Sequence, residues 1–255
     1  DVSGADLVID FGSDFLDTGS SPTEHAGQLA KSRDVSSHRD GGARLIAVSA
    51  RQNLTASNAD HWVPAAPGSE GVLALALAKA VADRKGATGF GSALAGANVA
   101  KAIAAAGISQ KLFDHIADKL AAAKHAVALP PGIAASSTAG AGAAAAVLLL
   151  NAVVGAIGDS VTYPAEDAPK RSSLKDVLAL VEAMKAGRVD CLLIHDLNPV
   201  FSLPASAGFA EALSKVGLVV SFASLEDETS AVAGMLLPDH TPMESWGDAS
   251  PRPGV

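Results

Sequence analysis

Short apolar runs alternate with stretches of helical periodicity along most of this chain. The apolar runs predict strands at residues 7–11, 45–48, 125–129, 189–194 and 218–222. Apolar residues three and four positions apart predict helices at residues 70–83, 93–106, 109–124, 174–185, 208–215 and 226–233. This repeated order of strand and helix predicts an α/β fold, with doubly wound, mainly parallel sheets and helices on both faces.

Two further segments carry helix signals. Ser21, Pro22 and Glu24 have the spacing of a capping box, so a helix is expected to begin there. The stretch 139–158 is mostly Ala and Gly and contains the polar Asn151; because Ala and Gly contribute little to membrane insertion, we expect a buried helix rather than a membrane span. The composition of residues 134–146 fits a flexible loop that leads into this helix as well as it fits disorder.

The polar segment 164–173, with Pro164 and Pro169, is the best candidate for an exposed connection. It predicts one α/β domain over residues 1–163 and a second α/β segment over residues 164–255, which ends in a proline-rich tail.

Composition excludes several classes of function. With 255 residues the chain can bury a sizeable core without a metal or a disulfide, and a formal net charge of -8 without a basic face argues against nucleic acid as a partner. The single cysteine, Cys191, rules out a disulfide within the chain and a cysteine-ligated iron–sulfur cluster. The first residues lack a basic start followed by an apolar run, so no export signal is expected there.

The loops that follow the strands are the places to look for a ligand, because parallel sheets bind ligands at the carboxyl ends of their strands. Where a dinucleotide site usually has an acidic residue after its second strand, this chain has Ser49, which loses a charge-assisted hydrogen bond. The loops at residues 12–20 and 195–202 carry Asp14, Asp17 and Asp196, which would repel a diphosphate. The alternative is that these carboxylates satisfy backbone donors in turns.

Two acid–histidine pairs follow separate strands. His195 with Asp196 and Asp239 with His240 could converge into a metal site or an acid–base pair, or could be solvated loop residues. No metal-ligand spacing pattern occurs, so we expect no metal site and no catalytic residue.

Several motifs together resemble the molybdopterin (bis-guanine-dinucleotide) oxidoreductase family, whose fold is of the formate dehydrogenase/DMSO reductase type. The motifs lie at Val48–Arg51, Thr55–Asp60, Ala66–Glu70, Leu150–Gly158, Asn198–Pro199 and Asp227–Pro238. They match, in order, the family's Asp-Pro-Arg, Thr-x-x-Ala-x-x-Ala-Asp, Arg-Pro-Gly-Thr-Asp and Leu-Asn…Gly-Asn-Ile-Gly segments, its second nucleotide loop and its Glu-Thr…Leu-Pro segment.

The chain departs from the family where the nucleotides would bind. Where the family has Gly-x-Asn-Pro, this chain has Gly12-Ser-Asp-Phe15, and the aspartate of Asp-Pro-Arg is replaced by Ser49. The family's aspartate that would contact guanine is Glu70 here, and Asp196 stands in place of a glycine in the second loop. The resemblance therefore implies vestigial nucleotide loops that bind no cofactor, at Gly12, Ser13, Asp14, Ser49, Arg51, Glu70, Asp196, Asn198, Pro199, Glu228 and Thr229.

One subgroup shares these losses, the molybdopterin-like part of the iron–sulfur subunit of bacterial alternative complex III, a quinol-oxidising respiratory complex. Glu244–Asp248, Pro251–Gly254 and Ser13–Leu16 resemble its sequence. The resemblance implies a non-catalytic scaffold on the periplasmic side of a membrane-associated complex, without a direct membrane span. Its partners would include an iron–sulfur domain and cytochrome c subunits.

Two alternatives stay open. The chain could be a fragment of an active oxidoreductase that binds molybdenum and bis-MGD, the two guanine-dinucleotide pterins. It could also be a soluble nucleotide-binding module for GDP or GTP.

Overall fold

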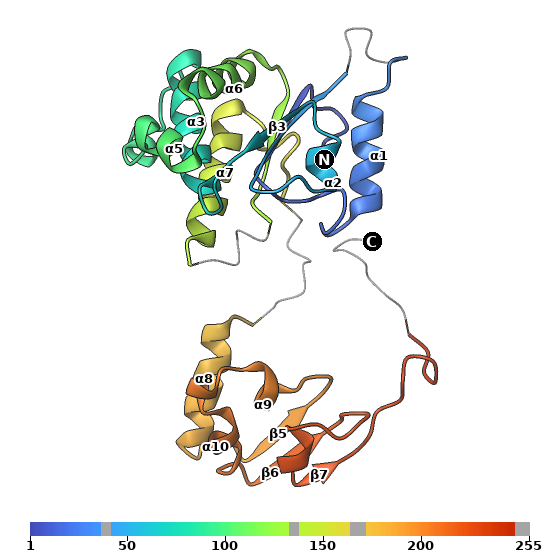
Figure 1. The fold of residues 1–255 in the computed structure, drawn as a ribbon. Helices are drawn as coiled ribbons and strands as arrows, with labels where there is room; N and C mark the ends of the chain where they lie inside the picture. The colour runs from blue at the N-terminus through green and yellow to red at the C-terminus, as the bar shows by residue number, and fades with distance from the viewer. Residues whose placement is uncertain (37–41, 133–137, 164–171, 248–255) are drawn as a thin grey trace. The chain divides into compact units, whose positions relative to one another are not determined.

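The computed structural model describes residues 1–36, 42–132, 138–163 and 172–247. It contains two compact units, Asp1–Tyr163 and Pro164–Val255, which are described separately (Figure 1). Residues 164–171 of the expected connection 164–173, residues 134–137 of the 134–146 segment and the end of the proline-rich tail lie outside the described residues.

The first unit is built on a parallel sheet whose strands lie in the order β3-β2-β1-β4. Strand β1 is buried along its whole length, as expected for a strand with neighbours on both sides and helices on both faces. The strands are β1 (Leu7–Asp10), β2 (Arg44–Ser49), β3 (His61–Pro64) and β4 (Ala126–Leu129).

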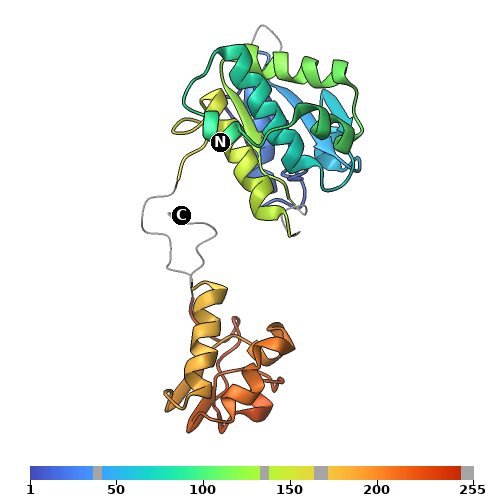
Figure 2. The same cartoon turned by 90° about the vertical axis from the view of Figure 1, so that its left-hand side faces the viewer.

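Helices cover both faces of this sheet, and successive side chains of each strand point to opposite faces. Ile9 and Ile46 join the core under α3, α6 and α7, whereas Val8 and Leu45 pack with Leu29 of α1. Figure 1 shows α1 on one side of the sheet, and Figure 2 views the unit from the side of the α3, α6 and α7 layer. The helices are α1 (Pro22–Ser32), α2 (Leu54–Ser57), α3 (Glu70–Lys85), α4 (Gly91–Leu94), α5 (Val99–Ala106), α6 (Gln110–Ala122) and α7 (Gly140–Val154).

The second unit has a smaller parallel sheet in the order β5-β6-β7. Its α-helices α8 and α10 pack together and against the sheet through Val181, Met184, Leu213, Ile194 and Val219. Its elements are α8 (Leu174–Lys185), β5 (Cys191–Ile194), α9 (Pro199–Ser202), a 3-10 turn (Ala205–Ala207), α10 (Phe209–Leu213), β6 (Leu218–Ser221), a 3-10 turn (Ser230–Val232) and β7 (Met235–Leu236).

Several local expectations from the sequence were wrong. The expected helix 226–233 is a single 3-10 turn, because Asp227 and Ser230 hydrogen-bond each other's backbone N–H groups with their side chains and so compete with a helix. The expected helix 93–106 is divided between α4 and α5, where Asn98 caps a new start. Ser21 precedes α1 but bonds the Glu24 carboxylate instead of the helix backbone.

The alanine-rich segment does form a buried helix. Val147 and Leu150 of α7 lie in the main core, and α7 packs along α3, where Gly71 leaves no room for a side chain against Ala143. Within the described residues, no helix has both the length and the apolar character that crossing a membrane requires.

Candidate functional site

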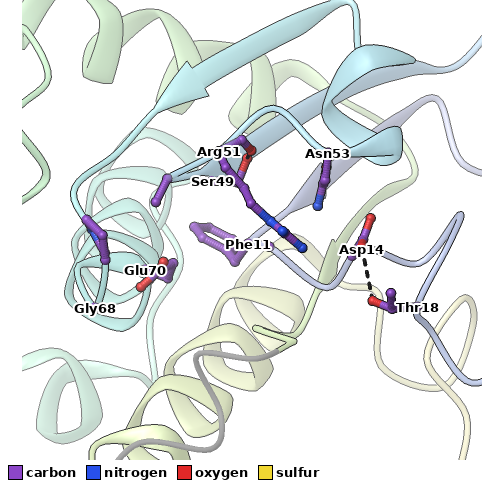
Figure 3. Close-up of a pocket in the computed structure, with 11 residues that line it drawn as sticks. Phe11, Asp14, Thr18, Ser49, Arg51, Asn53, Gly68 and Glu70 are labelled. Carbon is purple, nitrogen blue, oxygen red and sulfur yellow. Dashed lines mark hydrogen bonds between the residues drawn. The ribbon is translucent and has the colours of Figure 1, made fainter.

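The loops after β1, β2 and β3 surround a cavity of about 530 Å³ in the first unit (Figure 3). The cavity brings together Gly12, Asp14, Ser49, Arg51 and Glu70, all of which the sequence marks as positions of the first nucleotide loop set. The remaining lining residues are Phe11, Thr18, Ala50, Asn53, Pro67 and Gly68.

The residue that sequence reasoning missed is Asp10, the last residue of β1. Its side chain is 1% exposed, and its carboxylate accepts hydrogen bonds from the backbone N–H of Gly12 (3.2 Å), the backbone N–H of Ser13 (3.0 Å) and the Ser13 hydroxyl. In a nucleotide-binding loop, such N–H groups bind phosphate. Here an internal carboxylate already occupies them. An acid at the end of an apolar strand, followed by Gly-Ser, is the signal that could have revealed it.

Burial raises the pKa of the Asp10 carboxyl from 3.8 to about 6, although hydrogen bonds from Ser13 and Gly12 act in the opposite direction. The folded protein therefore holds this proton more tightly than the unfolded chain. The contribution of Asp10 to the free energy of unfolding is fully present below about pH 4 and is lost as the pH rises through about 6. This contribution amounts to about 3 kcal/mol.

We expect Asp10→Asn to remove this pH dependence. The difference in the free energy of unfolding between wild type and variant should change by about 2–3 kcal/mol between pH 4 and pH 7.5, with the wild type relatively weaker at the higher pH. Urea denaturation at several pH values measures it. The matched control is Asp17→Asn, at an exposed acid of the same loop, against which the profile of Asp10→Asn is compared. Parallel profiles for wild type and Asp10→Asn would contradict the assignment.

Asp14 lies in the left-handed region, with φ of 52°, and is almost fully buried. Its carboxylate accepts from the hydroxyls of Thr18 (3.0 Å) and Thr55 (3.4 Å), so it ties the loop after β1 to α2. Its partners are hydroxyls and not the backbone donors that the turn interpretation expected. Asp17 is exposed, and it does not line the cavity.

On the other side of the cavity, the polar side chains also interact with neighbouring groups of the protein. The Ser49 hydroxyl donates to the Arg51 carbonyl (2.8 Å) and accepts from the Trp62 indole (3.2 Å). Glu70 is buried at the first position of α3, where its carboxylate complements the helix dipole. Two carboxylates and one guanidinium therefore line the cavity, which is a poor charge balance for a diphosphate.

A backbone contact joins the loops at the point where the strand order reverses, between β1 and β4. The N–H of Gly132 donates to the carbonyl of Gly12 at 3.1 Å. A Cβ at position 132 would stand 2.6 Å from that same oxygen, so only glycine permits this approach. The loops thus touch at the switch point, where open α/β sheets bind their ligands.

In the second unit, the structure brings Asn198, Glu228 and Thr229 together and leaves Asp196 exposed, with φ of 51°. Asn198 donates to the Glu228 carboxylate (2.6 Å) and accepts from the Thr229 hydroxyl (2.7 Å), while Pro199 starts α9. The hydrogen bond from Asn198 lowers the pKa of Glu228. These contacts fasten the loop after β5 to the loop after β6.

His195 and Asp239 converge, with 2.6 Å between Nε2 and Oδ2, and the imidazole lies against Phe222. The hydrogen bond to His195 lowers the pKa of Asp239. Both side chains are largely exposed, and no third ligand joins them: the described part of the chain contains no group of three or more residues able to hold a metal.

Comparison with known proteins places this geometry in context. No protein-family model matches the chain. The chain is 28% identical over 273 residues to the menaquinone reductase, molybdopterin-binding-like subunit, of Nitratidesulfovibrio vulgaris (strain Hildenborough), an alignment that covers 97% of this chain and 38% of the relative. Among solved structures, acetylene hydratase from Pelobacter acetylenicus matches with a TM-score of 0.63 at 14% identity, over 91% of this chain and 40% of that one.

These matches show that the chain is similar to molybdopterin-oxidoreductase-like proteins. The structural match confirms the expected doubly wound α/β class. The chain spans about 38% and 40% of the lengths of these two proteins.

Proposed function

We propose that this chain is a non-catalytic, molybdopterin-oxidoreductase-like scaffold module of a quinone-linked respiratory electron-transfer complex. The observation that carries the proposal is the Asp10 carboxylate, which takes the N–H groups of Gly12 and Ser13 that a phosphate would need. The name of the menaquinone reductase subunit, molybdopterin-binding-like, supports the quinone-linked and molybdopterin-oxidoreductase-like aspects of the proposal.

The residues of the cavity do not fit bis-MGD. A phosphate oxygen about 4 Å from the Asp14 or Glu70 carboxylate would be repelled by about 4 kcal/mol at an effective dielectric constant of about 20. The backbone donors of the loop after β1 cannot offset this repulsion, because Asp10 already accepts from them. No chemistry is therefore assigned to a cofactor in this cavity.

The finer part of the proposal is an alternative complex III type of assembly. The resemblance of Ser13–Leu16 and Glu244–Asp248 to that subgroup supports it. The module would then lie on the periplasmic side of a bacterial membrane and contact an iron–sulfur domain and cytochrome c subunits.

Metal analysis and calorimetry of the purified chain test the proposal. We expect molybdenum and pterin far below one per chain, and no GDP binding tighter than about 1 mM, which corresponds to about 4 kcal/mol. Stoichiometric molybdenum with pterin would favour the fragment of an active oxidoreductase instead. A dissociation constant for GDP below about 10 µM would favour a nucleotide-binding module.

A matched pair of variants separates charge repulsion from a merely poor shape. Asp14→Asn removes a cavity charge and keeps a residue that tolerates the left-handed conformation. It should bind GDP measurably more tightly than the wild type, whereas Asp17→Asn should not.

A further inference from the structure

The sheet of the second unit has one face that no helix of the described residues covers. Side chains alternate along a strand, and partners in register share a face, so one face carries Cys191, Leu193, Leu218, Val220 and Met235. We call these five residues the open face. The other face carries Leu192, Ile194 and Val219, which pack under α8 and α10.

The open face is apolar and accessible. Leu193 is 63% exposed, Met235 47% and Leu218 42%, and Cys191 is exposed as well. Val220, on the central strand, is 5% exposed. None of the five side chains carries a charge, which is unusual for a solvated sheet face and typical of one that packs on another element.

We infer that an amphipathic helical segment of the same longer polypeptide covers the open face. Parallel sheets are covered on both faces by helices, so a helix with an apolar stripe is the occupant that this geometry fits. A second copy would instead oppose two parallel sheets, which is not how such sheets pack.

The lengths of the two similar proteins indicate where such a helix would come from. The menaquinone reductase subunit and acetylene hydratase each have more than half of their residues outside the part that this chain matches. Polypeptide of that kind would supply the missing layer. The inference deepens the proposed scaffold role and rests on it, since it names the surface through which the module is held in place.

Photo-cross-linking tests the inference in the natural host. Leu193 is replaced by a diazirine amino acid of similar size in the gene as it stands there, and the cross-linked peptides are identified by mass spectrometry. The expected product joins position 193 to a helical segment encoded in the same reading frame, outside these 255 residues. A cross-link to a second copy, to residues 1–163 or to a separately encoded protein would overturn the inference, as would a face that cross-links to nothing.

Cys191 provides an independent readout, because it lies on the open face and its modification can be followed on its own peptide by mass spectrometry. A thiol reagent should modify it readily in the isolated 255-residue chain and at least about tenfold more slowly in the natural protein. Leu193→Glu should abolish that protection, whereas Leu225→Glu, at an even more exposed leucine of the same unit, should keep it. Equal reactivity in both settings would overturn the inference.

The two proposals fail separately. Molybdenum or GDP binding would refute the scaffold role but would leave the protection of Cys191 as it is. An unprotected Cys191 in a molybdenum-free protein would refute only the covering helix.

Discussion

Asn151→Asp is expected to lower the free energy of unfolding of the Asp1–Tyr163 unit by about 3–5 kcal/mol at pH 8. Asn151 lies on α7 and pairs with the edge strand β4 as another strand would. Its side-chain oxygen accepts from the Ala128 N–H, and its amide donates to the Ala128 carbonyl, both at 2.8 Å. A carboxylate would keep the first bond, but it would place a buried negative charge against the carbonyl oxygen.

The pH dependence identifies this mechanism. A protonated carboxyl can again donate to the Ala128 carbonyl and accept from its N–H, so most of the loss should disappear near pH 4. The sign follows because burial raises the pKa of such an acid in the folded state, and stability is then greater at low pH. A loss that is equal at pH 4 and pH 8 would contradict this pairing.

Urea denaturation followed by tryptophan fluorescence measures the effect. The chain has two tryptophans; Trp62 is in the first unit and donates to Ser49, whereas Trp246 is fully exposed and should report little change. The control is Leu148→Ala, on the exposed side of the same helix, which should cost less than about 1 kcal/mol.

Phe11→Ala is expected to cost about 3–5 kcal/mol of the free energy of unfolding. The Phe11 ring is 0% exposed, lies in the main core and forms part of the wall of the cavity shown in Figure 3. Truncation removes buried apolar surface and leaves a void that the rigid sheet cannot fill. The wall of the candidate site is thus also part of the core.

The same truncation elsewhere gives the matched control. Phe201 is 74% exposed in the second unit, so Phe201→Ala should change stability by less than about 0.5 kcal/mol. The same fluorescence-monitored denaturation, with circular dichroism to follow both units, compares the two variants. A loss below about 1 kcal/mol for Phe11→Ala would show that the ring contributes little to the core.

The sequence by itself was sufficient for the α/β class, for the positions of the long helices and for strands β1, β2, β4, β5 and β6, because hydrophobic periodicity is a local property that burial selects. It also identified the loops that line the cavity. Strand β3 has a single buried residue, and β7 is only two residues long, so neither carries a pattern from which a strand could be predicted.

Only the tertiary structure decided the contacts between residues that are distant in the sequence. It placed Asn151 beside Ala128, joined Gly12 to Gly132, brought His195 to Asp239 and left one face of the second sheet open. The physical reason is that such contacts depend on how whole elements pack. Local propensity and spacing do not record that packing, and the sequence pattern therefore shows which side chains can pair without showing which of them meet.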